Sequence, residues 1–270
     1  MGSCDACGAW AERGHENMNA MPRTGTALLL CALLAGAAHA QDQMNSRLNQ
    51  ERVGDIDPGT YSADGINFTL DRYGDKYLLR FAGDPEVYVL YTDRASLGGR
   101  ILKYDSGQTV IRVAGWGALT LYTDAAPGGV PAERTGDTLP PSLGMISLSD
   151  MQNAAEDEAE HLAYSRRIHL TFTADWNALA GDSRLRALCF DALENTARGI
   201  DRFAMSAPAR AAFARKIDQV RMALGTKPIM FLSGKTLNVT FNAQSGYAGR
   251  ASSRGITRAL GQLLTVNVAD

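Results

Sequence analysis

A short apolar run at residues 27–36 constrains this chain more than any other feature. Arg23 stands before the run, and residues 38–40 form a small-residue cleavage site after it. This order is typical of a cleavable secretory signal peptide, here residues 21–40. The run is too short for a membrane-spanning helix, which needs roughly 20 apolar residues. We therefore predict cleavage after Ala40, a periplasmic or secreted location, and no transmembrane segment in the mature chain.

Residues 1–20 are expected to be a start-site extension, because the charged start of a signal peptide normally stands at the terminus. Cys4 and Cys7 in this extension lack the second ligand pair or redox fold that such a motif needs. Cys31 lies inside the signal and raises the alternative of a lipid-anchored protein, but the residues before it lack the small side chain that lipid attachment requires. After cleavage only Cys189 is left, so no intramolecular disulfide is expected.

The 230 residues after Ala40 can form one large domain or two smaller ones, since a chain of this size buries roughly 70 to 75% of its unfolded surface. The whole chain has 27 Lys and Arg and 29 Asp and Glu, of which two basic and three acidic residues precede cleavage. The mature chain is thus nearly neutral, with 25 basic against 26 acidic residues. A nucleic-acid partner is not expected, because such proteins carry a basic excess or stripe.

Residues 41–58 form a polar leader, and a β-rich region follows at residues 59–123. Short runs with β propensity are separated there by Gly, Asp and Pro residues, which favour turns. The expected strands cover residues 66–70, 77–81, 87–91, 100–104, 110–113 and 118–122. Ile66 and Phe68 alternate with polar residues, as in a half-buried strand. This pattern predicts an antiparallel β-meander.

A segment rich in Pro and Gly at residues 124–146 is expected to be a linker or long surface loop. The remaining residues, 147–270, mix helices with strands, and they could share one domain with the β-rich region. Expected helices start at Ser147 or Ser149, at Asp182 or Ser183, and at Ser206, the last running past Val220 to Leu224. Expected strands cover residues 168–172, 229–232 and 237–241, and the tail from residue 252 is expected to form a helix and then a strand. The prediction is an α+β fold, with a mixed half that holds a helical hairpin and two or three further strands.

Motifs with a catalytic meaning are weak. The sequence Gly234-Lys235-Thr236 resembles the end of a phosphate-binding loop, but the required earlier glycine is replaced by Ile229, so a hairpin turn is the better interpretation. Cys189 falls on an apolar helical stripe and is expected to be a buried structural thiol. No catalytic residue, metal site or cofactor is predicted.

The two histidines of the mature chain, His161 and His169, could serve as a general base or as metal ligands. No surrounding motif of a metal-dependent or serine hydrolase accompanies them. We therefore expect structural or surface histidines.

Three segments of the β-rich region carry a family resemblance: YVLYTD at residues 88–93, KYDSG at 103–107 and GWGALTLY at 115–122. With these the chain resembles an uncharacterised family of exported alphaproteobacterial proteins, domain of unknown function 4908, over most of the mature chain. The resemblance implies a cell-envelope location. It assigns no activity and no site residues.

The candidate ligand-binding residues are Trp116, Tyr91, Tyr122, Asp93 and Asp124. Trp116 stands between two glycines, which leave a large ring accessible for stacking on a sugar or a partner, although a core-filling tryptophan is the alternative. The other four come from an internal echo, in which LYTD at residues 90–93 recurs at 121–124. Asp residues at two such strand ends could bind a cation or a sugar. Common strand and turn chemistry is the simpler explanation of the echo, because two copies are fewer than the three that a repeat architecture needs.

Arg250, Arg254 and Arg258 recur at four-residue spacing and would share a helix face, where they could bind phosphate or carboxylate groups of the envelope. Solvated surface charge is the alternative. Two hypotheses for function follow. The first is a non-catalytic periplasmic module that binds an envelope component or a protein partner. The second is a periplasmic hydrolase of unidentified type that uses His161 or His169 in a cleft with Asp, Glu or Ser.

Overall fold

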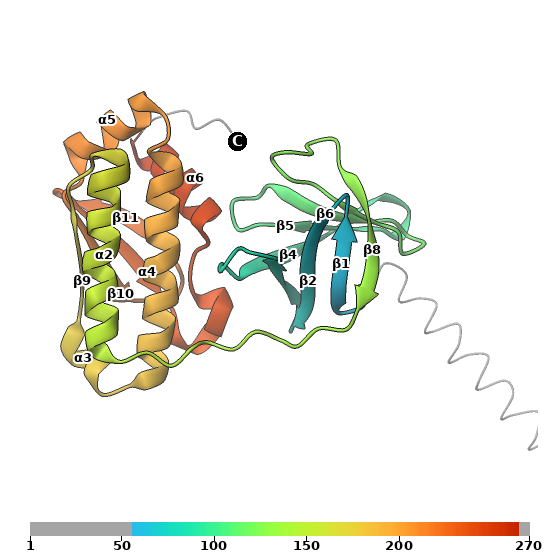
Figure 1. The fold of residues 1–270 in the computed structure, drawn as a ribbon, viewed down its shortest axis with the longest axis horizontal. Helices are drawn as coiled ribbons and strands as arrows, with labels where there is room; N and C mark the ends of the chain where they lie inside the picture. The colour runs from blue at the N-terminus through green and yellow to red at the C-terminus, as the bar shows by residue number, and fades with distance from the viewer. Residues whose placement is uncertain (1–55, 265–270) are drawn as a thin grey trace, which may run out of the picture. The chain divides into compact units, whose positions relative to one another are not determined.

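The computed structural model of the protein describes residues 56–264, which lie within one compact unit of residues 53–270 (Figure 1). The predicted extension, the signal peptide and most of the polar leader lie outside the described residues, as does the end of the tail strand expected after residue 264. None of the described helices is long and apolar enough to cross a membrane.

Eight antiparallel strands form a closed barrel, in which each strand pairs with the next and β1 also pairs with β8. The strands are β1 (Gly59–Ala63), β2 (Ile66–Tyr73), β3 (Lys76–Phe81), β4 (Tyr88–Arg94), β5 (Arg100–Lys103), β6 (Thr109–Val113), β7 (Leu119–Leu121) and β8 (Val130–Gly136), with a short 3-10 turn η1 (Ser96–Gly98) between β4 and β5. The prediction of consecutive antiparallel strands is confirmed. The sheet differs from a simple meander in that it closes on itself as a barrel.

Closure depends on β8, which lies inside the segment expected to be a linker or loop. Its sequence, VPAERTG, is too polar to signal a strand by alternation. Backbone pairing with β1 on one side and β7 on the other holds these residues in a strand, although their own pattern does not predict one. The Arg134 guanidinium adds hydrogen bonds to the Pro58 carbonyl at 3.0 and 3.1 Å. Closure leaves the barrel without a free sheet edge.

The barrel interior is an apolar core of alternating inward-facing residues. Phe68, Leu70, Leu79, Leu90 and Leu121 are each at most 1% exposed. Tyrosines lie where the core meets the loops, since the ring is apolar and the hydroxyl needs a polar partner. The ring of Tyr88 packs edge-on against that of Tyr104, with centroids 5.2 Å apart.

The second half is a four-stranded sheet of order β11-β12-β10-β9, in which β10 is parallel to β9 and β12, and β11 is antiparallel to β12. Its elements are α2 (Leu148–Arg166), β9 (Thr171–Ala174), α3 (Trp176–Ala180), α4 (Ser183–Phe203), α5 (Ala207–Lys216), β10 (Gln219–Leu224), β11 (Met230–Ser233), β12 (Thr236–Phe241), η2 (Ala243–Gly249) and α6 (Ser253–Leu264). Figure 1 shows α2 and α4 side by side across this sheet. Both strands and helices are present, as an α+β protein requires.

Three helix starts follow the predicted capping signals. The side chains of Ser147, Asp182 and Ser206 each accept a hydrogen bond from a backbone N–H in the first turn of α2, α4 and α5. The Gly234 turn joins β11 to β12 as a hairpin, as expected in place of a phosphate loop.

The third predicted helix is too long. The chain leaves helical geometry at Ile217, and Val220 and Leu224 belong to β10. The residues on which the helix was based also fit a strand, because Val220 and Met222 are buried while Arg221 between them is exposed. The mixed half therefore has four strands among the described residues, where two or three were expected.

Helices α4 and α6 pack closely at Gly199. A Cβ atom there would lie 2.6 Å from the Ile256 side chain, and the Gly199 carbonyl accepts a hydrogen bond from the Thr257 hydroxyl at 3.1 Å. The absent side chain thus sets how near α6 lies to α4. This position of α6 brings its amino terminus against the loops of the barrel.

Candidate ligand-binding cavity

Loops of the barrel cap the amino terminus of α6. Ser252 donates its backbone N–H to the Asp105 carboxylate at 2.7 Å, and its hydroxyl donates to the same carboxylate. The backbone N–H of Ser253 donates to the Glu86 carboxylate at 2.8 Å. The first N–H groups of a helix have no partner within the helix, and the positive end of its dipole favours a carboxylate. The barrel and α6 are thus joined by charge-assisted hydrogen bonds.

Arg250 holds the same junction from the other side. Its guanidinium donates to the Val87 carbonyl at 2.7 Å and pairs with Asp191, and its side chain is 1% exposed. Arg250 lies just before α6 in an extended conformation. The prediction of three arginines on one helix face is therefore wrong for Arg250, since only Arg254 and Arg258 lie on α6 at four-residue spacing.

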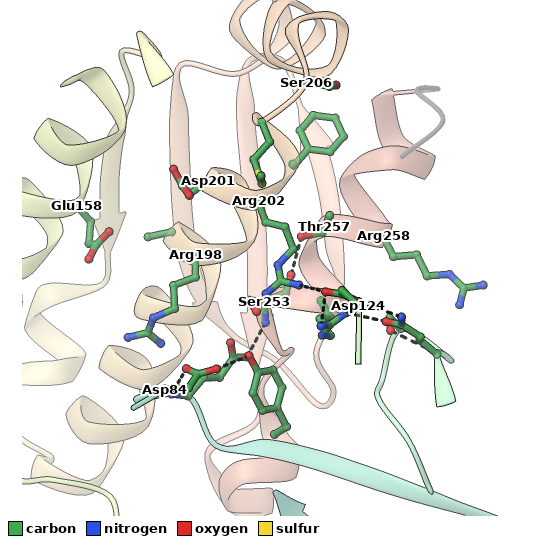
Figure 2. Close-up of a pocket in the computed structure, with 18 of the residues that line it drawn as sticks. Asp84, Asp124, Glu158, Arg198, Asp201, Arg202, Ser206, Ser253, Thr257 and Arg258 are labelled. Carbon is green, nitrogen blue, oxygen red and sulfur yellow. Dashed lines mark hydrogen bonds and ion pairs between the residues drawn. The ribbon is translucent and has the colours of Figure 1, made fainter. Parts of the chain in front are cut away.

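Beside this junction is a cavity of about 930 Å³ between barrel loops and the helices α2, α4 and α6 (Figure 2). Most of its lining residues are polar or charged. The barrel contributes Asp84, Glu86, Tyr88, Ser106, Gln108 and Asp124, α2 contributes Glu158 and His161, α4 contributes Arg198, Asp201 and Arg202, and α6 contributes Ser253, Arg254, Thr257 and Arg258.

One end of the cavity is rich in arginine. Arg254 donates to Asp124 at 2.8 and 3.2 Å and to Gln108 at 2.7 Å, and its guanidinium lies 4.8 Å from the centre of the Tyr104 ring. Arg202 reaches the same carboxylate only at 3.7 Å. The hydrogen bond from Arg254 holds the pKa of Asp124 below its usual range. The Asp124 carboxylate is thus shared between Arg254 and Arg202.

Another part of the lining is acidic. Glu86 is 1% exposed, and burial raises its pKa against the opposing hydrogen bonds from Ser253. The Tyr88 hydroxyl donates to Asp84 at 2.9 Å, and burial, followed by the nearby carboxylates, raises the tyrosine pKa. Burial also raises the pKa of Glu158, with Glu194 as the next cause. These carboxylates would accept hydrogen bonds from donors of a bound molecule.

Only Asp124 among the five residues predicted for ligand binding lines this cavity. Trp116 lies in the turn between β6 and β7 with 81% of its surface exposed, so the core-filling alternative is wrong. Gly117 beside it has φ +92°, a conformation that favours glycine. A tight turn therefore explains Gly117.

The other residues of the internal echo lie apart from the cavity. Tyr91 is 38% exposed, with the Lys76 ammonium 5.7 Å from its ring centre, and the two line a shallow hollow at the side of the barrel. Asp93 is exposed and accepts a hydrogen bond from Lys103 at 2.6 Å. Tyr122 is half-buried beneath Gly129, where a Cβ atom would lie 2.7 Å from its ring. The structure does not bring the echo together as one site.

The histidines differ in position. His161 lies in the lining near Glu158, and His169 is exposed between α2 and β9, away from the cavity. The described residues contain no group of three or more His, Cys, Asp or Glu side chains placed to hold a metal ion. Cys189 is buried as predicted, and burial raises the pKa of its thiol to about 12.

Sequence reasoning missed Arg202, Gln108 and Glu86 as parts of one site. Arg202 stands on the polar face of α4, and Gln108 and Glu86 lie in hairpin connections, where polar residues are ordinary. Barrel closure and the docking of α6 bring them together. The one available signal was the Arg254–Arg258 spacing, and both of these residues line the cavity.

Comparison with known protein families matches residues 40–260 to the family described as Domain of unknown function (DUF4908). The match covers most of the chain. The chain belongs to the DUF4908 family. Comparisons with curated proteins and with solved structures gave no match. The DUF4908 match identifies the predicted family and carries no residue roles, so the cavity must be interpreted from its own chemistry.

Proposed function

We propose that this DUF4908 protein is an exported, non-catalytic binding module of the cell envelope, and that a small polar ligand occupies the cavity between the barrel and α6. The cavity is the observation that carries the proposal. Its volume of about 930 Å³ is in the range of small-molecule sites, and its polar groups come from elements far apart in the sequence. Such convergence is what a specific ligand requires.

The hydrogen bonds of the lining support binding over catalysis. Nucleophilic catalysis needs a hydroxyl or thiol hydrogen-bonded to a base that is itself oriented by a third group. Ser206 accepts a hydrogen bond from the Ala209 backbone as a helix cap. The carboxylates Asp84, Glu86 and Asp124 are held by fixed donors. This arrangement is a preorganised set of donors and acceptors.

One observation favours the alternative of a hydrolase: His161 lines the same cavity as Glu158 and Ser206. His161 makes no hydrogen bond to either of them in the described part of the chain. His169 is not in the lining. A turnover assay of His161→Ala tests the alternative, because a hydrolase that uses this residue loses turnover.

Native mass spectrometry of protein purified from the envelope fraction tests the proposal. The expected result is a small molecule that is retained on the folded protein and released on unfolding. The variant Gln108→Trp places a large ring in the cavity and should lose the molecule, while Trp116→Ala, far from it in the β6–β7 turn, should retain it. A folded protein with no retained mass, or equal retention in both variants, would contradict the proposal.

A further inference from the structure

Positive charge at one end of the cavity exceeds the carboxylate that lines it. Arg254 donates to the Asp124 carboxylate at 2.8 Å, Arg202 reaches it at 3.7 Å, and Arg258 lies one turn further along α6 (Figure 2). Two guanidinium groups therefore share one carboxylate, and the third has no carboxylate partner within residues 56–264. Charges held this close without full compensation raise the free energy of the empty site and favour an added anion.

Arg258 is the least compensated of the three. It makes no hydrogen bond or ion pair with any residue of the described range 56–264, and it is exposed to the cavity. Its guanidinium lies against Gly107, where a Cβ atom would come within 2.7 Å of it. The loop that presents Gln108 to Arg254 thus also supports Arg258. The two arginines, one helical turn apart on α6, lie next to the same barrel loop.

A buried polar atom at the same place lacks a partner. The Nε of Arg254 is buried and makes no hydrogen bond within the described chain. Arg254 lines the cavity. Buried polar groups are nearly always paired, and an unpaired one calls for a missing partner such as a ligand. An oxyanion would accept a hydrogen bond from this Nε.

The amino terminus of α6 is not itself the anion site. Its first N–H groups are already taken, by Glu86 at Ser253 and by the Ser252 hydroxyl at Gly255, 3.1 Å away. Binding must therefore come from side chains. A guanidinium offers two parallel donors that match the oxygens of a phosphate or a carboxylate.

We infer that the ligand of the proposed cavity carries an oxyanion group, which Arg202, Arg254 and Arg258 bind. This inference rests on the proposed function and adds the chemical class of the ligand. Phosphate and carboxylate share the geometry that the three arginines recognise, so separate probes distinguish them.

Isothermal titration with inorganic phosphate and with succinate tests the inference. The expected result is saturable binding of one of them, weakened about tenfold or more in Arg258→Gln, because one charge-assisted hydrogen-bond donor is lost. Arg258 makes no contact that stabilises the fold, so this variant should fold as the wild type does. Arg112→Gln is the matched control, since Arg112 is an exposed arginine on β6 outside the lining, and its affinity should be unchanged.

Two outcomes overturn the inference. The first is that neither phosphate nor succinate binds. The second is that Arg258→Gln and Arg112→Gln lose affinity equally, as expected if the anion responds only to the net charge of the protein. If native mass spectrometry still finds a retained neutral or cationic molecule that Gln108→Trp abolishes, the oxyanion inference fails while the proposed binding function stands. If no molecule is retained and neither anion binds, both fail.

Discussion

The Asp105 carboxylate accepts two hydrogen bonds from Ser252, which lies 147 residues further along the chain, one from its backbone N–H and one from its hydroxyl. A β5–β6 connection thereby caps a helix of the other half. The cavity lies beside this junction, so its shape depends on contacts between residues distant in the sequence.

Replacing Asp105 by Ala removes both hydrogen bonds. We expect the free energy of unfolding to fall by about 1 to 3 kcal/mol, the usual cost of a lost charge-assisted cap. Urea denaturation followed by circular dichroism measures it. Asp93→Ala is the control, because the Asp93–Lys103 pair is largely exposed and should contribute less than about 1 kcal/mol. Equal losses in the two variants would contradict the role of Asp105.

Glu86 should make the stability of the fold depend on pH. Burial raises its pKa, so the folded protein holds this proton more tightly than the unfolded chain does. The contribution of protonated Glu86 to the free energy of unfolding is complete below the unfolded-state pKa of about 4.3. It is lost as pH rises through the higher pKa of the folded state. In Glu86→Gln this loss is absent, while the amide oxygen can still accept the hydrogen bond from Ser253.

Urea midpoints measured across this pH range test the role of Glu86. The wild-type midpoint should fall relative to that of Glu86→Gln as pH rises. Glu133→Gln, at an exposed position on β8, should follow the wild type. Parallel profiles for Glu86→Gln and wild type would show that Glu86 is not the titrating group.

Gly199→Ala should destabilise the protein although alanine favours helix formation. The new Cβ would lie 2.6 Å from Ile256, so α6 must shift, at a cost of about 1 to 3 kcal/mol that exceeds the helical gain of about 1 kcal/mol. Thermal unfolding measures it. Gly144→Ala is the control, because no atom lies within 4 Å of its added methyl group. An unchanged or higher Tm for Gly199→Ala would contradict the close α4–α6 packing.

Trp116→Ala should leave both stability and ligand retention unchanged. The side chain is 81% exposed in a turn and lies outside the cavity, so the free energy of unfolding should change by no more than about 0.5 kcal/mol. Urea denaturation and native mass spectrometry check the two parts. Loss of the retained molecule would move the binding site to the β6–β7 turn.

Local signals predicted the elements better than their assembly. Six of the eight barrel strands and the capped starts of α2, α4 and α5 follow from alternation, turn residues and N-cap side chains. Strand β8 carries no such signal, since its pairing partners and not its own residues make it a strand. The end of α5 was wrong because Val220 and Leu224 suit both a helical and a β period.

The site was less predictable than the fold, because most of its members are polar residues that look like ordinary surface residues in the sequence. Asp124 was predicted from the LYTD echo, whose two copies do not form one site in the structure. Arg254 and Arg258 were predicted from their four-residue spacing. Arg202 became a neighbour of all three only through the packing of α4 against α6. Contacts between residues so far apart in the chain cannot be predicted from the local order of polar and apolar residues.

A nitrogen–proton NMR titration of the folded protein with inorganic phosphate and then with succinate tests the central claim most directly. Our account predicts that one of these anions shifts the side-chain Nε–H signals of Arg202, Arg254 and Arg258 together with the Ser253 amide, and leaves the backbone amide signals of Trp116 and Tyr91 in place. Shifts that map to the β6–β7 turn or to the hollow beside Lys76, with the cavity arginines unaffected, would contradict it.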